Sequence, residues 1–183
     1  EYTWIKNGTI LDEKAEEIYV CSQYIQIYSL EGKYKRTLKI DCFDHDMKII
    51  DYNDESLLIY DDVVIEIDWD GNILWKWECH EHFDEFGFSE VAKNAIFRTP
   101  GVKHGDSWDW FHINSMSLVG PNKWYDQGDK RFHPENIIID GRVTNIMAII
   151  DKKTGKIVWQ LGPDFSSGRA KKIGQIIGQH HAH

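Results

Sequence analysis

The chain has few cysteines and lacks long apolar runs. Its three cysteines, Cys21, Cys42 and Cys79, are odd in number and show no paired motif, so they demand no disulfide and specify no compartment. One disulfide pair in an oxidising compartment stays open. No segment approaches the roughly 18 consecutive apolar residues that a membrane-spanning helix requires. We therefore expect no membrane span.

Basic residues are also scarce. Lysine and arginine number 21 against 30 aspartates and glutamates, which gives a formal net charge of −9. The sequence shows neither a basic stripe nor a nucleic-acid-binding motif, so a nucleic-acid partner is not expected. Residues 1–4, Glu-Tyr-Thr-Trp, have the pattern of a strand and not of a signal peptide, and the location of the protein stays open.

Aromatic residues and alternating apolar residues are abundant. The chain has eight each of Trp, Tyr and Phe, which favours strands and cross-strand packing. Two alternating runs flank Asp70-Gly71 in residues 63–77, and this pattern predicts a β-hairpin. Residues 146–161 repeat the pattern around Gly155, and residues 24–35 repeat it more weakly around Gly32. Each hairpin is interpreted as the outer part of a four-stranded antiparallel propeller blade.

Histidines recur at nearly constant spacing. His45, His112 and His180 are separated by 67 and 68 residues, and the first two each open a short alternating run. Equivalent positions in successive repeats of an arrayed fold face a common axis or groove. The spacing therefore predicts that the three imidazoles lie near one site.

The length of the chain limits this interpretation. A chain of 183 residues holds fewer than three repeats of this spacing, whereas propellers close with about 4–8 blades. We predict an all-β fold, an incomplete propeller of about three blades with a short connecting helix. The predicted segments are 1–41 (partial blade), 42–110 (blade plus helical connection), 111–179 (blade with insertion) and 180–183 (start of the next blade). Such a set leaves sheet faces exposed unless another chain covers them, so a homo-oligomer is one alternative.

Two segments interrupt the strand pattern. Residues 85–98 have apolar side chains at helical spacing with Ser89 as a candidate cap, which predicts the connecting helix. Residues 119–134 are rich in Gly, Pro, Asn and Asp and lengthen one repeat. Insertions of this kind usually lie on one face, often the binding face.

Five motifs follow in order from about residue 40 to the end. They are Phe43-Asp44-His45-Asp46, then Asp109-Trp110-Phe111-His112-Ile113-Asn114-Ser115, then residues 136–145, residues 151–163, and Gly178-Gln179-His180-His181-Ala182. Together they resemble the bacterial arylsulfotransferase family, and the second and last are the most specific. The resemblance implies a six-bladed propeller whose central channel passes a sulfuryl group from a phenolic sulfate ester to a phenol, without the adenylyl-sulfate donor.

The resemblance also implies the site. The nucleophile would be His180, transiently sulfated, with His45, His112, Asn114 and Arg142 around it. It implies an aryl sulfate donor and a phenolic acceptor as small-molecule partners, and it is compatible with a periplasmic or secreted location. We predict no cofactor. One departure is the pair Asp140-Gly141, where the family pattern usually has serine.

These residue types suit the chemistry on general grounds. Imidazole has an unperturbed pKa of about 6.5, so much of it is a neutral nucleophile near pH 7. The negative charge of a sulfuryl group favours fixed donors, such as the guanidinium of Arg142, the amide of Asn114 and the N–H groups of His45 and His112. His45 or His112 could give the leaving phenolate its proton and recover one from the acceptor.

Several alternatives remain open. Trp108 and Trp110 could line an aromatic substrate pocket, while Trp75, Trp77 and Trp159 suit blade packing. Residues 79–82, Cys-His-Glu-His, could hold a metal if they formed a strand, but no second cluster follows, and we predict no metal site. A non-catalytic propeller that binds a ligand or partner is the main alternative function, because a fold alone does not decide function. A metal- or quinone-dependent enzyme is the third.

Overall fold

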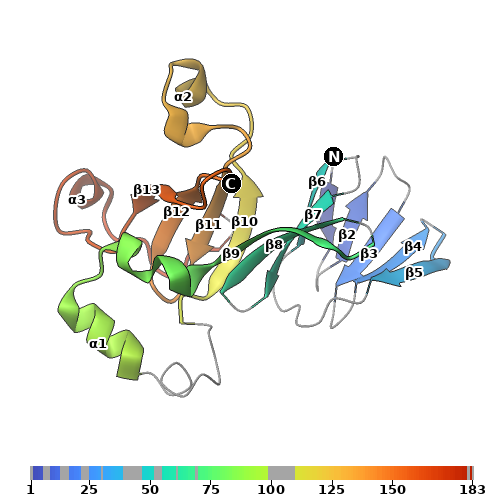
Figure 1. The fold of residues 1–183 in the computed structure, drawn as a ribbon, viewed down its shortest axis with the longest axis horizontal. Coiled ribbons are helices and arrows are strands. Elements are labelled where there is room, and N and C mark those ends of the chain that lie inside the picture. Colours follow the sequence, from blue (N-terminus) through green and yellow to red (C-terminus); the bar gives the residue numbers. More distant parts are fainter. Residues whose placement is uncertain are drawn as a thin grey trace. The chain divides into compact units, whose positions relative to one another are not determined.

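The structure is a computed structural model that describes most of the chain. The described residues are 2–5, 9–12, 17–21, 25–29, 31–38, 47–51, 55–60, 62–68, 70–98, 110–180 and 182. The chain forms two compact units, one of Glu1–Tyr60 and Val64–Lys76, the other of Asp61–Val63 and Trp77–His183. Figure 1 shows the elements of both units.

Three antiparallel sheets follow one another along the chain, and within each sheet the strands lie in sequence order. The first sheet has five strands, namely β1 (Tyr2–Ile5), β2 (Thr9–Asp12), β3 (Glu17–Cys21), β4 (Ile25–Ser29) and β5 (Tyr34–Leu38). The second has four, namely β6 (Met47–Asp51), β7 (Glu55–Tyr60), β8 (Val63–Asp68) and β9 (Ile73–Glu78).

The third sheet carries most of the candidate site. Its strands are β10 (Ile113–Leu118), β11 (Ile137–Gly141), β12 (Ile146–Ile150) and β13 (Ile157–Leu161). β10 and β11 pair antiparallel, with Leu118 opposite Ile137 and Ile113 opposite Gly141. The register shifts between Ile113 and Ser115, so Asn114 is the extra residue of a β-bulge.

The three predicted hairpins are present, and their turns are alike. Gly32, Gly71 and Gly155 all have positive φ, at 77°, 86° and 72°. In each turn the glycine N–H donates to the carbonyl oxygen of a residue at or just after the end of the first strand. These carbonyls belong to Ser29, Asp68 and Asp151, respectively. Glycine adopts this left-handed backbone without steric cost, which is why the short motif predicted the turns.

Short helical segments surround the third sheet (Figure 1). They are η1 (Cys79–Phe86), α1 (Glu90–Arg98), α2 (Lys123–Asp126), η3 (Lys130–Phe132) and α3 (Ala170–Ile173). The predicted helix over 85–98 begins late, because Gly87 ends η1 in the left-handed conformation, φ 66°. The Ser89 hydroxyl then accepts from the Ala92 N–H at 3.2 Å, as a cap does.

An aromatic core joins η1 to the start of β10. Phe86 and Phe111 are fully buried with ring centroids 4.7 Å apart, and Trp110 packs edge-on against Phe83 at 5.1 Å and Phe88 at 5.9 Å. This cluster fixes the two residues that precede His112. Buried aromatic side chains contribute much of the stability of a protein core, so this packing stabilises the start of β10.

The fold is mostly β, as predicted, and consists of antiparallel up-and-down sheets of the kind that form propeller blades, here an incomplete set. The sheets lie within the predicted segments 1–41, 42–110 and 111–179; the blade boundaries themselves stay a prediction. Among the described residues, no helix is long and apolar enough to cross a bilayer.

Candidate functional site

His112 and Arg142 lie side by side at one end of the third sheet. His112 directly precedes β10 and Arg142 directly follows β11, and the antiparallel pairing puts these two strand ends together. The backbone N–H of Arg142 donates to the carbonyl oxygen of His112 at 2.9 Å. The Arg142 side chain is exposed and His112 is partly exposed, so both lie at the surface of this sheet end.

His112 has an unusual backbone. Its φ is 58°, in the left-handed region that non-glycine residues seldom adopt. Its neighbours Phe111 and Ile113 are both fully buried, so the surrounding packing holds this conformation. Backbone outliers of this kind cluster at functional sites, where the surrounding structure over-determines them.

Asn114 connects β10 to the segment that contains His180. The bulge places Asn114 outside the regular alternation of β10, and its Nδ2 donates to the carbonyl oxygen of Gln179 at 3.3 Å. An asparagine amide carries two N–H donors, so a second one remains for another acceptor. The contact joins residues 65 positions apart in the sequence.

The backbone on both sides of His180 is fixed to the same sheet. The Gly178 N–H donates to Asn145 Oδ1 at 3.0 Å. The Gln179 Nε2 donates to the carbonyl oxygens of Gly141 at 2.6 Å and Ile146 at 3.1 Å, the residues that flank the turn containing Arg142. Beyond His180, the Ala182 N–H donates to Ser115 Oγ at 2.8 Å. His180 itself is exposed between these anchors.

The structure therefore brings four of the predicted site residues to one end of the third sheet, namely His112, Asn114, Arg142 and His180. His45 and Trp108 lie outside the described residues. Trp110 is only 6% exposed and belongs to the aromatic core, which accounts for its position without a substrate. The chemical roles of all these residues stay predictions.

Several residues of this arrangement were not singled out from the sequence. Gln179 and Ser115 lie inside the two most specific motifs, so the motifs did contain a signal for them. Asn145 lies at the end of the third motif and has a left-handed backbone, φ 57°. These residues bind backbone groups, and such a role leaves no pattern in spacing or composition.

The 119–134 insertion lies away from this site. It follows the end of β10, whereas His112 precedes the start of β10, so the two are at opposite ends of the strand. Asn122 holds the insertion together: its side chain accepts from the N–H groups of Trp124 and Tyr125 and donates to the carbonyls of Gly120 and Phe132. The insertion and His112 therefore lie at different ends of β10, and the expectation that the insertion marks the binding face stays a prediction.

The residues considered for a metal do not form a site. They belong to a 3-10 helix and not to a strand, and Cys79 is fully buried while His80 is exposed. His82 Nδ1 lies 2.7 Å from Glu85 Oε1, and its ring stacks on Trp77 at 4.8 Å. Within the described ranges, no three His, Cys, Asp or Glu side chains are placed to hold a metal ion.

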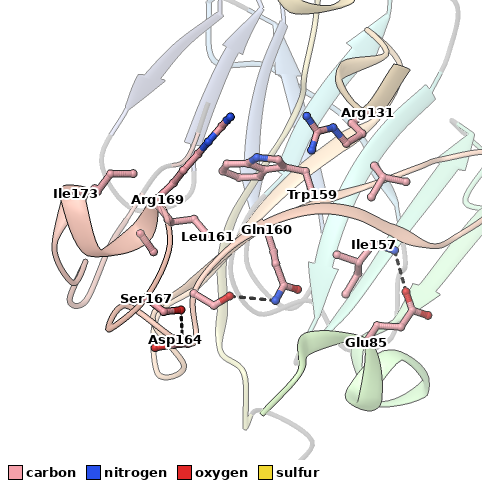
Figure 2. A pocket seen from close by; sticks show the side chains of 13 residues that line it. Glu85, Arg131, Ile157, Trp159, Gln160, Leu161, Asp164, Ser167, Arg169 and Ile173 are labelled. Carbon is pink, nitrogen blue, oxygen red and sulfur yellow. Dashed lines mark hydrogen bonds between the residues drawn. The ribbon is translucent and has the colours of Figure 1, made fainter. Parts of the chain in front are cut away.

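A groove of about 860 Å³ runs along β13, the far edge of the sheet from β10. Figure 2 shows Trp159 between the side chains of Arg131 and Arg169. The Arg131 guanidinium is paired with Asp129 at 2.6 Å. Trp159 lies 6.1 Å from Phe132, centroid to centroid, and is half-buried, so it packs on the insertion and also borders the groove. This groove is separate from the His112–His180 end of β10.

Comparison with known proteins gives one family. The arylsulfotransferase (ASST) family model matches residues 2–172. No curated protein matches the chain. Among solved structures, the WD40 domain of Neurospora crassa Pan2 is similar, with a TM-score of 0.46, 13% identity and coverage of 85% of this chain and 37% of that chain. The WD40 propeller domain of Doa1 has a TM-score of 0.46, 12% identity and coverage of 82% and 38%. The chain thus spans less than half the length of either.

Proposed function

The chain belongs to the arylsulfotransferase family, and from this premise we propose that the end of the third sheet around His180 is the site of sulfuryl transfer from a phenolic sulfate ester to a phenol. The observation that carries the proposal is the convergence of His112, Asn114, Arg142 and the backbone on both sides of His180 at one sheet end.

His180 is proposed as the nucleophile. A ring nitrogen attacks sulfur, the new N–S bond forms, and the bond from sulfur to the phenolic oxygen breaks, so the phenolate leaves with the electron pair. An acceptor phenol then loses its proton, attacks the same sulfur and breaks the N–S bond, which restores the imidazole. Anchoring of Gly178, Gln179 and Ala182, with His180 exposed between them, supports this role.

The neighbouring side chains are proposed to bind the sulfuryl oxygens. Arg142 offers a forked guanidinium from a backbone position that is bonded to His112, and Asn114 offers the second N–H of an amide that is held by the carbonyl of Gln179. Donors that are already oriented stabilise charge in the transition state without reorganisation. His45 is proposed as a further donor.

His112 is proposed to move the proton. The imidazolium form can protonate the leaving phenolate, and the neutral imidazole that results can take the proton of the acceptor phenol, so no external acid or base is consumed over the cycle. The left-handed backbone of His112 supports the proposal, because it fixes the direction of the side chain at a position next to Arg142. Trp108 is proposed to contact the aromatic ring of the substrate.

The test is donor-only incubation of the purified protein with 4-nitrophenyl sulfate. We expect release of 4-nitrophenolate in one stoichiometric burst, and a mass increase for one sulfuryl group on the peptide that contains His180. His180→Asn should abolish both. His80→Asn is the matched control, because His80 is also exposed but lies in η1. If the sulfuryl group were found on another residue, that residue and not His180 would be the nucleophile. Saturable binding of the sulfate ester without release of 4-nitrophenolate would support the non-catalytic alternative.

A further inference from the structure

Two buried carboxyl groups hold the segments that contain His112 and His180. Asp62 is 2% exposed and Asp140 is fully buried. Burial of a carboxyl group is costly unless its oxygens accept hydrogen bonds. The bonds that these two groups accept therefore matter to the local structure. Neither residue belongs to the set of His, Asn and Arg proposed for sulfuryl transfer.

Asp62 binds the backbone on both sides of His112. Its Oδ2 accepts from the Phe111 N–H at 2.7 Å, and its Oδ1 accepts from the Ile113 N–H at 3.1 Å. Asp62 comes from the segment before β8, 49 and 51 residues earlier in the chain. One carboxyl group thus fixes residues 111 and 113 and leaves the residue between them in the left-handed conformation.

Asp140 binds the segment beyond His180. Its Oδ2 accepts from the Ala182 N–H at 3.0 Å and from the Ser115 hydroxyl at 2.7 Å. The Ala182 N–H is also 2.8 Å from Ser115 Oγ, so these three residues form one buried cluster. Because Asn114 adjoins Ser115 and binds the carbonyl of Gln179, the same part of β10 is joined to the backbone on both sides of His180.

We propose that Asp62 and Asp140, the latter together with Ser115, are positioning residues of the transfer site, which set the backbone of His112 and of His180 without touching the substrate. The proposal rests on the proposed function of His180. Charged acceptors form the stronger hydrogen bonds in proteins, and an error of about 1 Å in a reacting group can lower a rate by roughly 10²-fold.

Ser115→Ala is the first test, with Ser117→Ala as its matched control. Both serines are buried on the same face of β10, two residues apart, at 2% and 6% exposure, but only Ser115 binds Ala182. We expect amide hydrogen exchange at Ala182, followed by NMR, to accelerate roughly tenfold or more in Ser115→Ala. Exchange at Ala182 should be unchanged in Ser117→Ala.

Asp62→Asn and Asp140→Asn test the carboxyl groups. We expect faster exchange at Phe111 and Ile113 only in Asp62→Asn, and at Ala182 only in Asp140→Asn. The rate of the sulfation burst should fall roughly tenfold or more in both, with KM changed less than about twofold, at a temperature at which thermal melts show every variant folded. A purely structural role would lower the melting temperature without changing the burst rate of the folded protein.

The two proposals fail in different ways. If the unsubstituted protein shows no burst, the transfer function is wrong, while amide exchange still decides whether the carboxyl groups hold the two segments. If exchange at Ala182 is the same in Ser115→Ala and Ser117→Ala, or if the burst rate of the folded Asp62→Asn and Asp140→Asn variants is unchanged, the positioning proposal is wrong.

Discussion

The backbone N–H of Arg142 donates to the carbonyl oxygen of His112, at 2.9 Å, so the two candidate residues are joined by a bond that needs neither side chain. The tie survives substitution of either side chain. Variants at Arg142 therefore report on side-chain chemistry, with little change in the local backbone.

Arg142→Lys is the first prediction. Lysine keeps the positive charge but loses the planar fork that matches two oxygens of a sulfuryl group, so we expect the rate of transfer to fall on the order of 10²-fold. The urea midpoint should hardly change, because the Arg142 side chain is exposed. The measurement is kcat/KM with 4-nitrophenyl sulfate. Arg169→Lys, another exposed arginine but at the β13 groove, is the control and should retain full activity.

The second prediction concerns the backbone of His112. At φ 58°, asparagine is tolerated but a β-branched residue is not. We expect His112→Val to unfold with about 1–2 kcal/mol less free energy than His112→Asn. Urea unfolding of the two variants gives the difference. Equal stabilities would show that the left-handed conformation is not retained in solution.

The sequence was sufficient for features that depend on a few adjacent residues. The Asp70-Gly71 turn was predicted because a left-handed glycine between two alternating runs is a local requirement, and Gly71 has that conformation. The Ser89 cap is equally local. The convergence of His112 and His180 toward one sheet end was suggested by motif order and spacing, but the spacing could not supply the contacts.

The features that the sequence did not reveal depend on distant residues. Asp62 binds residues about 50 positions away, and nothing near it in the sequence shows this. The bulge at Asn114 arises from pairing with β11, so β10 alone does not predict it. Residues 79–82 were considered as a strand, but they form a 3-10 helix in which the packing of Phe86 and Cys79 overrides the short alternating pattern.

Gly141→Ala is the third prediction. A Cβ at Gly141 would overlap the ring of Phe111 and lie 2.5 Å from Thr144 Oγ1. Phe111 is fully buried and cannot move aside freely, so we expect a loss of about 1–3 kcal/mol in the free energy of unfolding. Phe111→Ala alone should cost about 3–5 kcal/mol, and the double variant should cost less than the two losses together. Strict additivity in urea unfolding would contradict the contact.

The fourth prediction concerns Cys79. Its side chain is fully buried, and this burial, with a smaller effect from the charge of Asp62, raises the pKa of its thiol well above the usual value. Only the thiolate reacts rapidly with alkylating reagents. We expect iodoacetamide to leave Cys79 unlabelled at pH 8 in the folded protein and to label it after unfolding in urea, as measured by peptide mass spectrometry. Labelling in the folded state would show that η1 opens.

The fifth prediction concerns Glu85, which joins η1 to β13. Its Oε1 is 2.7 Å from His82 Nδ1, and its Oε2 accepts from the Ile157 N–H at 3.0 Å. Burial by itself would raise the pKa of the Glu85 carboxyl, but the bonds from His82 and Ile157 together outweigh this effect, so the pKa is lowered. A carboxyl group with a lowered folded-state pKa stabilises the fold fully above its unfolded pKa, about 4.3, and loses that contribution as the pH falls through the folded value.

Glu85→Gln therefore has an effect that depends on pH. The loss in urea midpoint relative to the unsubstituted protein should be full from about pH 5 upward and should shrink as the pH falls below about 4. Glu81→Gln is the control in the same 3-10 helix, since Glu81 is exposed and forms no hydrogen bond with any described residue. Its midpoint should match the unsubstituted protein throughout. A Glu85→Gln difference that grows toward acid pH would require a raised pKa, and the bonds to His82 and Ile157 would then not control this carboxyl group in solution.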